Sequence, residues 1–218
     1  MNEVPQIVLW GITFTEPTTF LTDMLVVAVC AVSSVKLYRN AIPSSRQNFR
    51  LLFLILIGIS ALTGGIYHLL TLYVSKNMAY ASWIVSGLGI FMLEMWTLSF
   101  LQDKRRLIFL SIAASALFIA SFTGVLIMKT FFPIVLRSII GIFAIVVPAR
   151  LQTKNQLPEQ IFKYFTYGVA FSILSGIAYI PALSIHKWFN NADMGHVLLA
   201  ISMYYFYRTA ATEKKTGY

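Results

Sequence analysis

The sequence has too few charged side chains to cover a water-soluble protein of its size. Asp, Glu, Lys and Arg make up 11% of the 218 residues, whereas 58% are hydrophobic and the mean hydropathy is +0.74. Ordinary soluble domains carry about 25% charged residues. The composition therefore excludes a soluble globule and indicates that lipid is the main solvent of the chain.

Segments of about ten residues with alternating polarity, which are typical of membrane β-barrels, are also missing. The apolar runs instead extend for about 20 residues, the length of a membrane-spanning helix. Hydrocarbon offers the backbone no hydrogen-bonding partner, so an α-helix is favoured, because it pairs its own N–H and C=O groups. The single cysteine, Cys30, lies within an apolar run, so an intrachain disulfide is excluded.

The apolar runs predict an all-α polytopic membrane protein, a seven-transmembrane helix bundle that forms one domain over residues 1–218. Charged residues or clusters of Pro, Gly and Asn bound each run. The connections are short, so consecutive spans should be antiparallel neighbours. The expected spans are residues 17–38, 50–74, 79–101, 106–128, 131–150, 163–185 and 193–209.

The basic residues predict an orientation. Thirteen of the 17 Lys and Arg residues follow spans one, three, five and seven. By the positive-inside rule, these segments and the C-terminus are cytoplasmic and the N-terminus is outside. The first fifteen or so residues contain no Lys or Arg, so they lack the basic region of a signal peptide and are expected to lie on the outer surface. The net charge of +9 then reflects orientation and attraction to anionic headgroups, and no nucleic-acid partner is expected.

Ionisable side chains inside a span are costly in lipid, so each one marks a candidate site. Counting about 1.5 Å per residue places Asp23, His68, Arg137 and His196 roughly 5 to 9 Å below the outer ends of four different spans. Asp193 lies at the mouth of the last span. We therefore expect a polar cluster in the outer leaflet.

Two interpretations of this cluster remain open. In the structural one, Arg137 pairs with Asp23 or Asp193, and neutral histidines help to fix helix register. In the functional one, His68 and His196 bind a zinc ion together with Asp193 or Asp23, and one coordination position holds water. Asp193 and His196 are three residues apart and share a helix face. An acid near a helix N-terminus is, however, favoured without any metal.

Other functions receive less support from the sequence. His68 and His196 could clamp a haem, but a transmembrane electron route usually needs two such pairs. Residues 194–207 contain no lysine for a retinal Schiff base. Glu94 is the only ionisable group in the inner half of a span, which disfavours a channel. Neither Glu94 nor His186, which precedes the last span, is assigned a role.

Two short motifs resemble those of the CREST superfamily of alkaline ceramidases and adiponectin/progestin receptor relatives. They are GGIYH at residues 64–68 and DMGH at residues 193–196. Members of that superfamily are seven-span hydrolases, or hydrolase-like receptors, that hold zinc through three histidines. The chain has Gly64 where the superfamily has a serine and Ala192 where it has another histidine, so the resemblance implies that Asp193 replaces a missing ligand.

The resemblance implies a metal-dependent intramembrane hydrolase that acts on a lipid amide or ester in the outer leaflet. Asp23 would take the proton from zinc-bound water, and Arg137 would hold a lipid phosphate or the developing oxyanion. The alternative is a non-catalytic seven-helix receptor-like protein, or a subunit whose protein partners pack against its lipid-facing surface. Either protein would reside in the inner membrane of a bacterium, or in an endomembrane or plasma membrane of a eukaryote.

Overall fold

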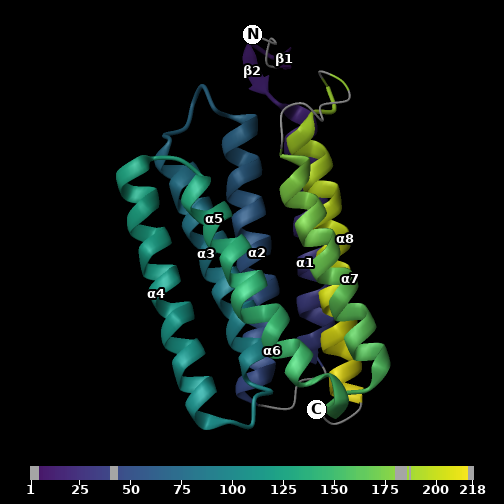
Figure 1. The fold of residues 1–218 in the computed structure, drawn as a ribbon. Helices are drawn as coiled ribbons and strands as arrows, with labels where there is room; N and C mark the ends of the chain where they lie inside the picture. Colours follow the sequence, from purple (N-terminus) through teal and green to yellow (C-terminus); the bar gives the residue numbers. More distant parts are fainter. Residues whose placement is uncertain (1–4, 40–43, 180–185, 187, 216–218) are drawn as a thin grey trace.

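A computed structural model describes residues 5–39, 44–179, 186 and 188–215. In this part of the chain, seven long helical segments follow a short β-hairpin and run roughly along one axis (Figure 1). The hairpin and the C-terminal helix end lie at opposite ends of this bundle (Figure 1). The elements are β1 (Gln6–Leu9), β2 (Ile12–Thr15), α1 (Pro17–Arg39), α2 (Ser45–Leu69), α3 (Asn77–Leu98), α4 (Lys104–Met128), α5 (Phe132–Gly141), the π-helix η1 (Ile142–Val146), α6 (Val147–Gln152), the 3₁₀-helix η2 (Lys154–Gln156), α7 (Glu159–Ala178) and α8 (Asn191–Lys215).

Six of these segments are long and apolar enough to cross a membrane, which confirms the predicted all-α membrane architecture. They are α1, α2, α3, α4, the continuous segment Phe132–Gln152 and α7. The last helix, α8, has 25 residues and the length of a span, but its polar and charged side chains make it less apolar.

The helix boundaries follow the sequence prediction within a few residues in most segments, but α7 covers Glu159–Ala178 where residues 163–185 were expected, α8 extends six residues beyond the predicted end at 209, and the second segment is displaced. It was expected at residues 50–74, whereas α2 covers Ser45–Leu69. Ser44 caps α2, because its side chain accepts a hydrogen bond of 3.1 Å from the Gln47 backbone N–H. The helix therefore begins before Arg46, which the prediction had placed outside it, and contains Arg50 within its second turn instead of at its start. The predicted end of the sixth span, residues 180–185, lies outside the described residues.

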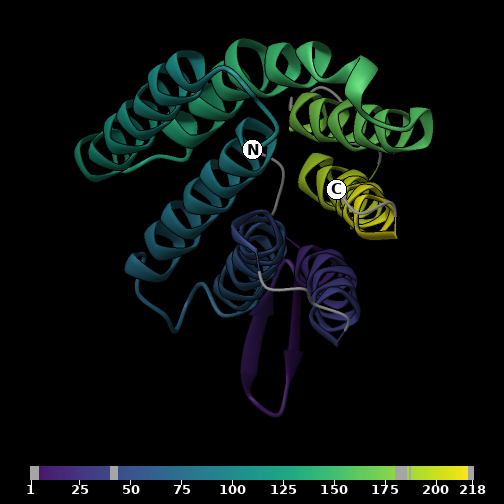
Figure 2. The same ribbon diagram turned by 90° about the horizontal axis from the view of Figure 1, so that it is seen from below.

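The packing order brings the last helix back to the first. Consecutive helices α1 to α4 pack against each other, and the segment α5–η1–α6 packs against α3 and α4. Helix α8 contacts both α7 and α1 along the bundle (Figures 1 and 2). Side chains of α1, α2 and α8 can therefore meet at either end of the bundle.

An aromatic cluster holds four helices together. Phe53 of α2, Trp96 of α3 and Phe206 of α8 are each almost fully buried, and Phe165 of α7 packs against Phe206 with ring centroids 5.7 Å apart. Phe53 and Phe206 meet edge to face at 5.3 Å. By contrast, α4 presents many large apolar side chains on its outside, as a lipid-facing helix does.

The N-terminal segment forms an antiparallel hairpin in which Leu9 pairs with Ile12. Trp10 and Gly11 form the turn, with φ of 50° and 77°. Positive φ at both central residues is what a two-residue type I′ turn requires, and Gly11 adopts it without steric cost.

Candidate functional site

The first part of the candidate site is a histidine of α8 that is held by two consecutive residues of α1. His196 Nε2 lies 3.4 Å from Asp23 Oδ1, and His196 Nδ1 lies 3.3 Å from the Thr22 hydroxyl. Asp23 and His196 are only 4% and 8% exposed. Both imidazole nitrogens therefore face α1, and the ring joins the first and last helices.

Asp193 completes this group at the beginning of α8. Its Oδ2 accepts a hydrogen bond of 2.7 Å from the Asn190 backbone N–H, and its Oδ1 lies 3.5 Å from the Thr22 hydroxyl. Asp193 is fully buried. We call Thr22, Asp23, Asp193 and His196 the hairpin-end cluster. Within it, one oxygen of Asp193 accepts a hydrogen bond from a backbone N–H at the start of α8, and the other oxygen faces α1.

His68 forms a separate pair beside this cluster. Its Nδ1 lies 2.6 Å from Glu16 Oε2, and both side chains are partly exposed. The Thr15 hydroxyl donates a hydrogen bond to the His68 carbonyl. His68 of α2 is thus fastened to the base of the hairpin.

Glycines of the two quoted motifs allow these groups to approach closely. A Cβ at Gly65 would lie 2.9 Å from Asp23 Cβ, and a Cβ at Gly195 would lie 2.9 Å from the ring of Tyr179. The Tyr179 ring packs edge to face on His196, with centroids 6.0 Å apart. Gly65 and Gly195 therefore act through their lack of a side chain.

Two polar atoms at the cluster have no hydrogen-bond partner among the described residues. They are Asp23 Oδ2 and Thr19 Oγ1, both buried. A buried carboxylate oxygen without a partner is unfavourable in a purely structural role. Asp23 Oδ2 can consequently accept a further hydrogen bond, while Asp23 Oδ1 contacts the His196 imidazole.

The side chains predicted to bind zinc do not form a metal-binding group in the described part of the chain. No three His, Cys, Asp or Glu side chains there are grouped so that they could hold an ion. His196 contacts Asp23, whereas His68 contacts Glu16. His186 is exposed, and its Nδ1 accepts a hydrogen bond from the Trp188 backbone. The residues therefore do not fit the zinc site that the resemblance implied.

Arg137 lies elsewhere in the bundle. It was expected to pair with Asp23 or Asp193, but its Nη2 lies 2.7 Å from Glu94 Oε2 in a fully buried ion pair. Similar depth along the chain did not bring Arg137 to the cluster, because α5 packs against α3 and α4 and not against α1 or α8.

A second buried charge cluster, which sequence reasoning missed, lies at the opposite end of the bundle. Glu213 of α8 accepts hydrogen bonds from Arg150 at 2.8 Å, from Arg50 at 3.3 Å and from the Trp96 indole at 3.0 Å. All four side chains are almost fully buried. A lone acid close to the C-terminus of a basic chain was the signal that could have indicated it, but the predicted span ended at residue 209.

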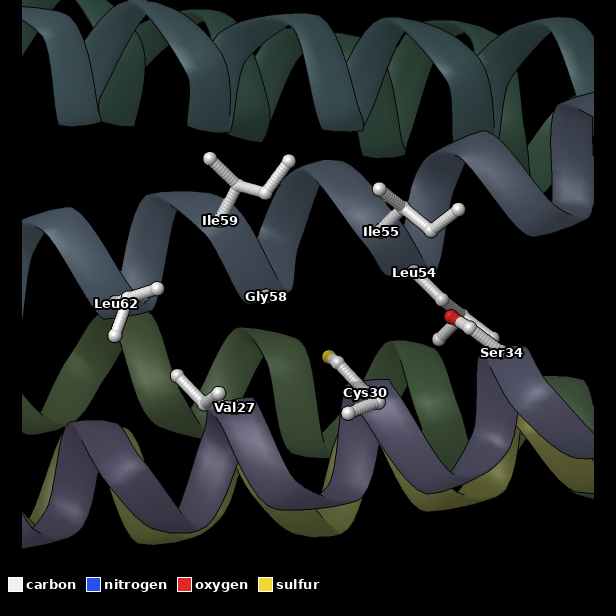
Figure 3. Close-up of a pocket in the computed structure, with 9 residues that line it drawn as sticks. Val27, Cys30, Ser34, Leu54, Ile55, Gly58, Ile59 and Leu62 are labelled. Carbon is white, nitrogen blue, oxygen red and sulfur yellow. The ribbon is translucent and has the colours of Figure 1, made fainter.

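The structure also has an apolar groove between α1 and α2, with a volume of about 220 Å³ (Figure 3). Cys30 and Val27 of α1 face Gly58 and Leu62 of α2 across it (Figure 3). Its lining is almost entirely apolar, so it offers no group for acid–base chemistry.

Comparison with protein families identifies a family to which the chain belongs. The model of a family of unknown function (DUF6962) matches residues 18–215. No curated protein and no solved structure matches the chain. The matched region begins one residue after the start of α1, extends to the end of α8 and leaves out the hairpin.

Proposed function

Since the chain belongs to a family of unknown function (DUF6962), we propose its function from the side chains of the hairpin-end cluster and from the topology of the bundle. The proposal is an integral membrane protein with seven spans that hydrolyses a lipid amide or ester at the outer leaflet. It retains the reaction class of the CREST superfamily, which two short motifs of the chain resemble.

Helix α8 serves as the seventh span. It packs along α1 and α7, and its charged residues Asp193 and Glu213 are buried against other helices, so they need not face lipid. An odd number of spans places the termini on opposite sides, in agreement with Figure 1. The basic loops lie at the end away from the hairpin, which supports an outer N-terminus and a cytoplasmic C-terminus.

The unpartnered oxygen of Asp23 is the observation that carries the hydrolase proposal. Asp23 Oδ2 is buried without a partner among the described residues, and Asp23 Oδ1 contacts His196. A carboxylate–imidazole pair can act as a general base. Asp23 accepts a proton from water as the water oxygen bonds to the acyl carbon. The same proton passes to the leaving nitrogen or oxygen when its bond to that carbon breaks.

Zinc has no step in this scheme, because the described side chains do not form a three-ligand group. Arg137 also has no step, since Glu94 neutralises it away from the cluster. Elemental analysis of the purified protein checks this assignment. Stoichiometric zinc would mean that these side chains rearrange to hold an ion, and would contradict the arrangement described above.

The second candidate is a non-catalytic seven-helix protein, either receptor-like or a subunit of a larger membrane assembly. It is favoured by the pairing of both span histidines with acids, His68 with Glu16 and His196 with Asp23. In that case the pairs would keep α1, α2 and α8 in register, and protein partners would pack against the lipid-facing surface.

The experiment that separates the two candidates uses purified protein in lipid nanodiscs that contain phosphatidylcholine and ceramide. Fatty acid release is measured by mass spectrometry for the wild type, Asp23→Asn and Glu159→Gln. Loss of a general base should lower the rate by about 100-fold or more. The exposed Glu159 should tolerate the same chemical change. Absence of release from the wild type would reject hydrolysis of these lipids, and full activity of Asp23→Asn would reject the site.

A further inference from the structure

We propose that the β1–β2 hairpin is a lipid-binding element that lies in the headgroup region of the leaflet at its end of the bundle. The hairpin residues 6–15 contain no charged side chain. Trp10 at its tip is 93% exposed and Val8 is 64% exposed. Ile7, Leu9 and Ile12 are also exposed. So many exposed apolar side chains on one short hairpin are unfavourable in water and indicate a binding partner.

The direction of the hairpin identifies where that partner lies. In the view along the bundle axis, the hairpin projects sideways beyond α1 and α2, away from the other helices (Figure 2). In the side view it lies at the end of the bundle (Figure 1). Because α1 and α2 are apolar enough to span a membrane, the hairpin extends over the lipid next to them.

Contacts at the base of the hairpin hold it in this direction. The Thr13 backbone N–H donates a hydrogen bond of 3.0 Å to the Tyr73 hydroxyl, beyond the end of α2. The Glu16 backbone N–H donates to the Pro5 carbonyl at 2.9 Å, and the Glu16 side chain pairs with His68. The tip is free, whereas the base is fastened to two places on the bundle.

Lipid fits this surface better than a protein does. A Trp side chain favours the membrane interface, where its ring is apolar and its N–H can reach headgroups or water. The hairpin has no charge that would select a charged protein partner. Its strand edges could instead pair with those of a second copy, which the experiment below detects.

The experiment places an environment-sensitive nitrobenzoxadiazole dye on Trp10→Cys in a Cys30→Ala background, so that the label has one site. The labelled protein is reconstituted in phosphatidylcholine vesicles with brominated acyl chains. Lys76→Cys is the matched control, because Lys76 is exposed in the α2–α3 connection at the same end of the bundle. Val8→Cys gives a second position on the hairpin if the Trp10 variant does not fold.

Labels at positions 10 and 8 should emit at shorter wavelength than the label at 76. Bromine should quench them about threefold more strongly, as expected for a group at the interface. Equal access of aqueous iodide to positions 10 and 76, without bromine quenching, would overturn the proposal. Excimer emission from pyrene at position 10, at protein-to-lipid ratios that leave the control unpaired, would overturn it in favour of pairing between copies.

Discussion

Glu94 of α3 and Arg137 of α5 form an ion pair from which solvent is excluded. Arg137 Nη2 lies 2.7 Å from Glu94 Oε2, and the exposed fractions of the two side chains are 1% and 0%. Gly141 lies four residues after Arg137, and the second oxygen of Glu94 rests directly against it. The pair therefore ties α3 to α5, and its Glu94 side chain also contacts Gly141, one residue before the π-helix begins.

Glu94→Gln should destabilise the protein strongly. The substitution leaves Arg137 as a buried charge without a counterion, which costs about 3 to 5 kcal/mol in soluble proteins. Thermal unfolding in detergent measures the loss, and Glu159→Gln at an exposed position should show almost none. Equal melting temperatures for the two variants would show that the pair contributes little. Replacing both Glu94 and Arg137 with Leu should recover most of the stability, because no charge is then left alone.

Gly141→Ala should disrupt the same contact for a steric reason. A Cβ at position 141 would overlap the Glu94 carboxylate. Gly176→Ala is the matched control, since nothing lies within 4 Å of its Cβ and alanine favours a helix by about 1 kcal/mol. We expect a lower melting temperature for the first variant and an equal or higher one for the second. The opposite order would contradict the observed packing of Glu94 on Gly141.

Glu213→Gln should release α8 from the end of the bundle away from the hairpin. Glu213 accepts hydrogen bonds from both Arg50 and Arg150, which are 4% and 2% exposed. Neutralising it leaves two buried cations, so the loss should reach or exceed that for Glu94→Gln. Hydrogen exchange followed by mass spectrometry should then show faster exchange in the last two turns of α8. Unchanged exchange in residues 205–215 would contradict this role.

Cysteine labelling tests the orientation proposed for the seven spans. Lys76→Cys and Gln102→Cys place single reactive cysteines in exposed connections at opposite ends of the bundle, in a Cys30→Ala background. With the N-terminus outside, a membrane-impermeant maleimide should label position 76 in intact cells and position 102 only after permeabilisation. The reverse pattern would show that the N-terminus is cytoplasmic.

The candidate site was predictable in part. Counting residues along each span placed Asp23, His68, Arg137 and His196 at one level, with Asp193 at the mouth of the last span. Of these, Asp23, Asp193 and His196 do lie together beside Thr22. The same count placed Arg137 with them. The depth of a residue along its helix, however, does not tell which neighbouring helix its side chain contacts. Glu16 was not considered, because it precedes the first span, and it is the partner of His68.

The sequence by itself determined the solvent of this protein and the approximate position of each long helix. Both follow from the composition of single segments, because a run of about 20 apolar residues enters lipid whatever its neighbours are. Only the tertiary structure decided which charges share a buried site. Arg50 stood at the predicted boundary of a span, next to a basic connection, but Glu213, 163 positions later, accepts its hydrogen bond inside the bundle. Such pairings depend on how the helices pack, and no local pattern records that packing.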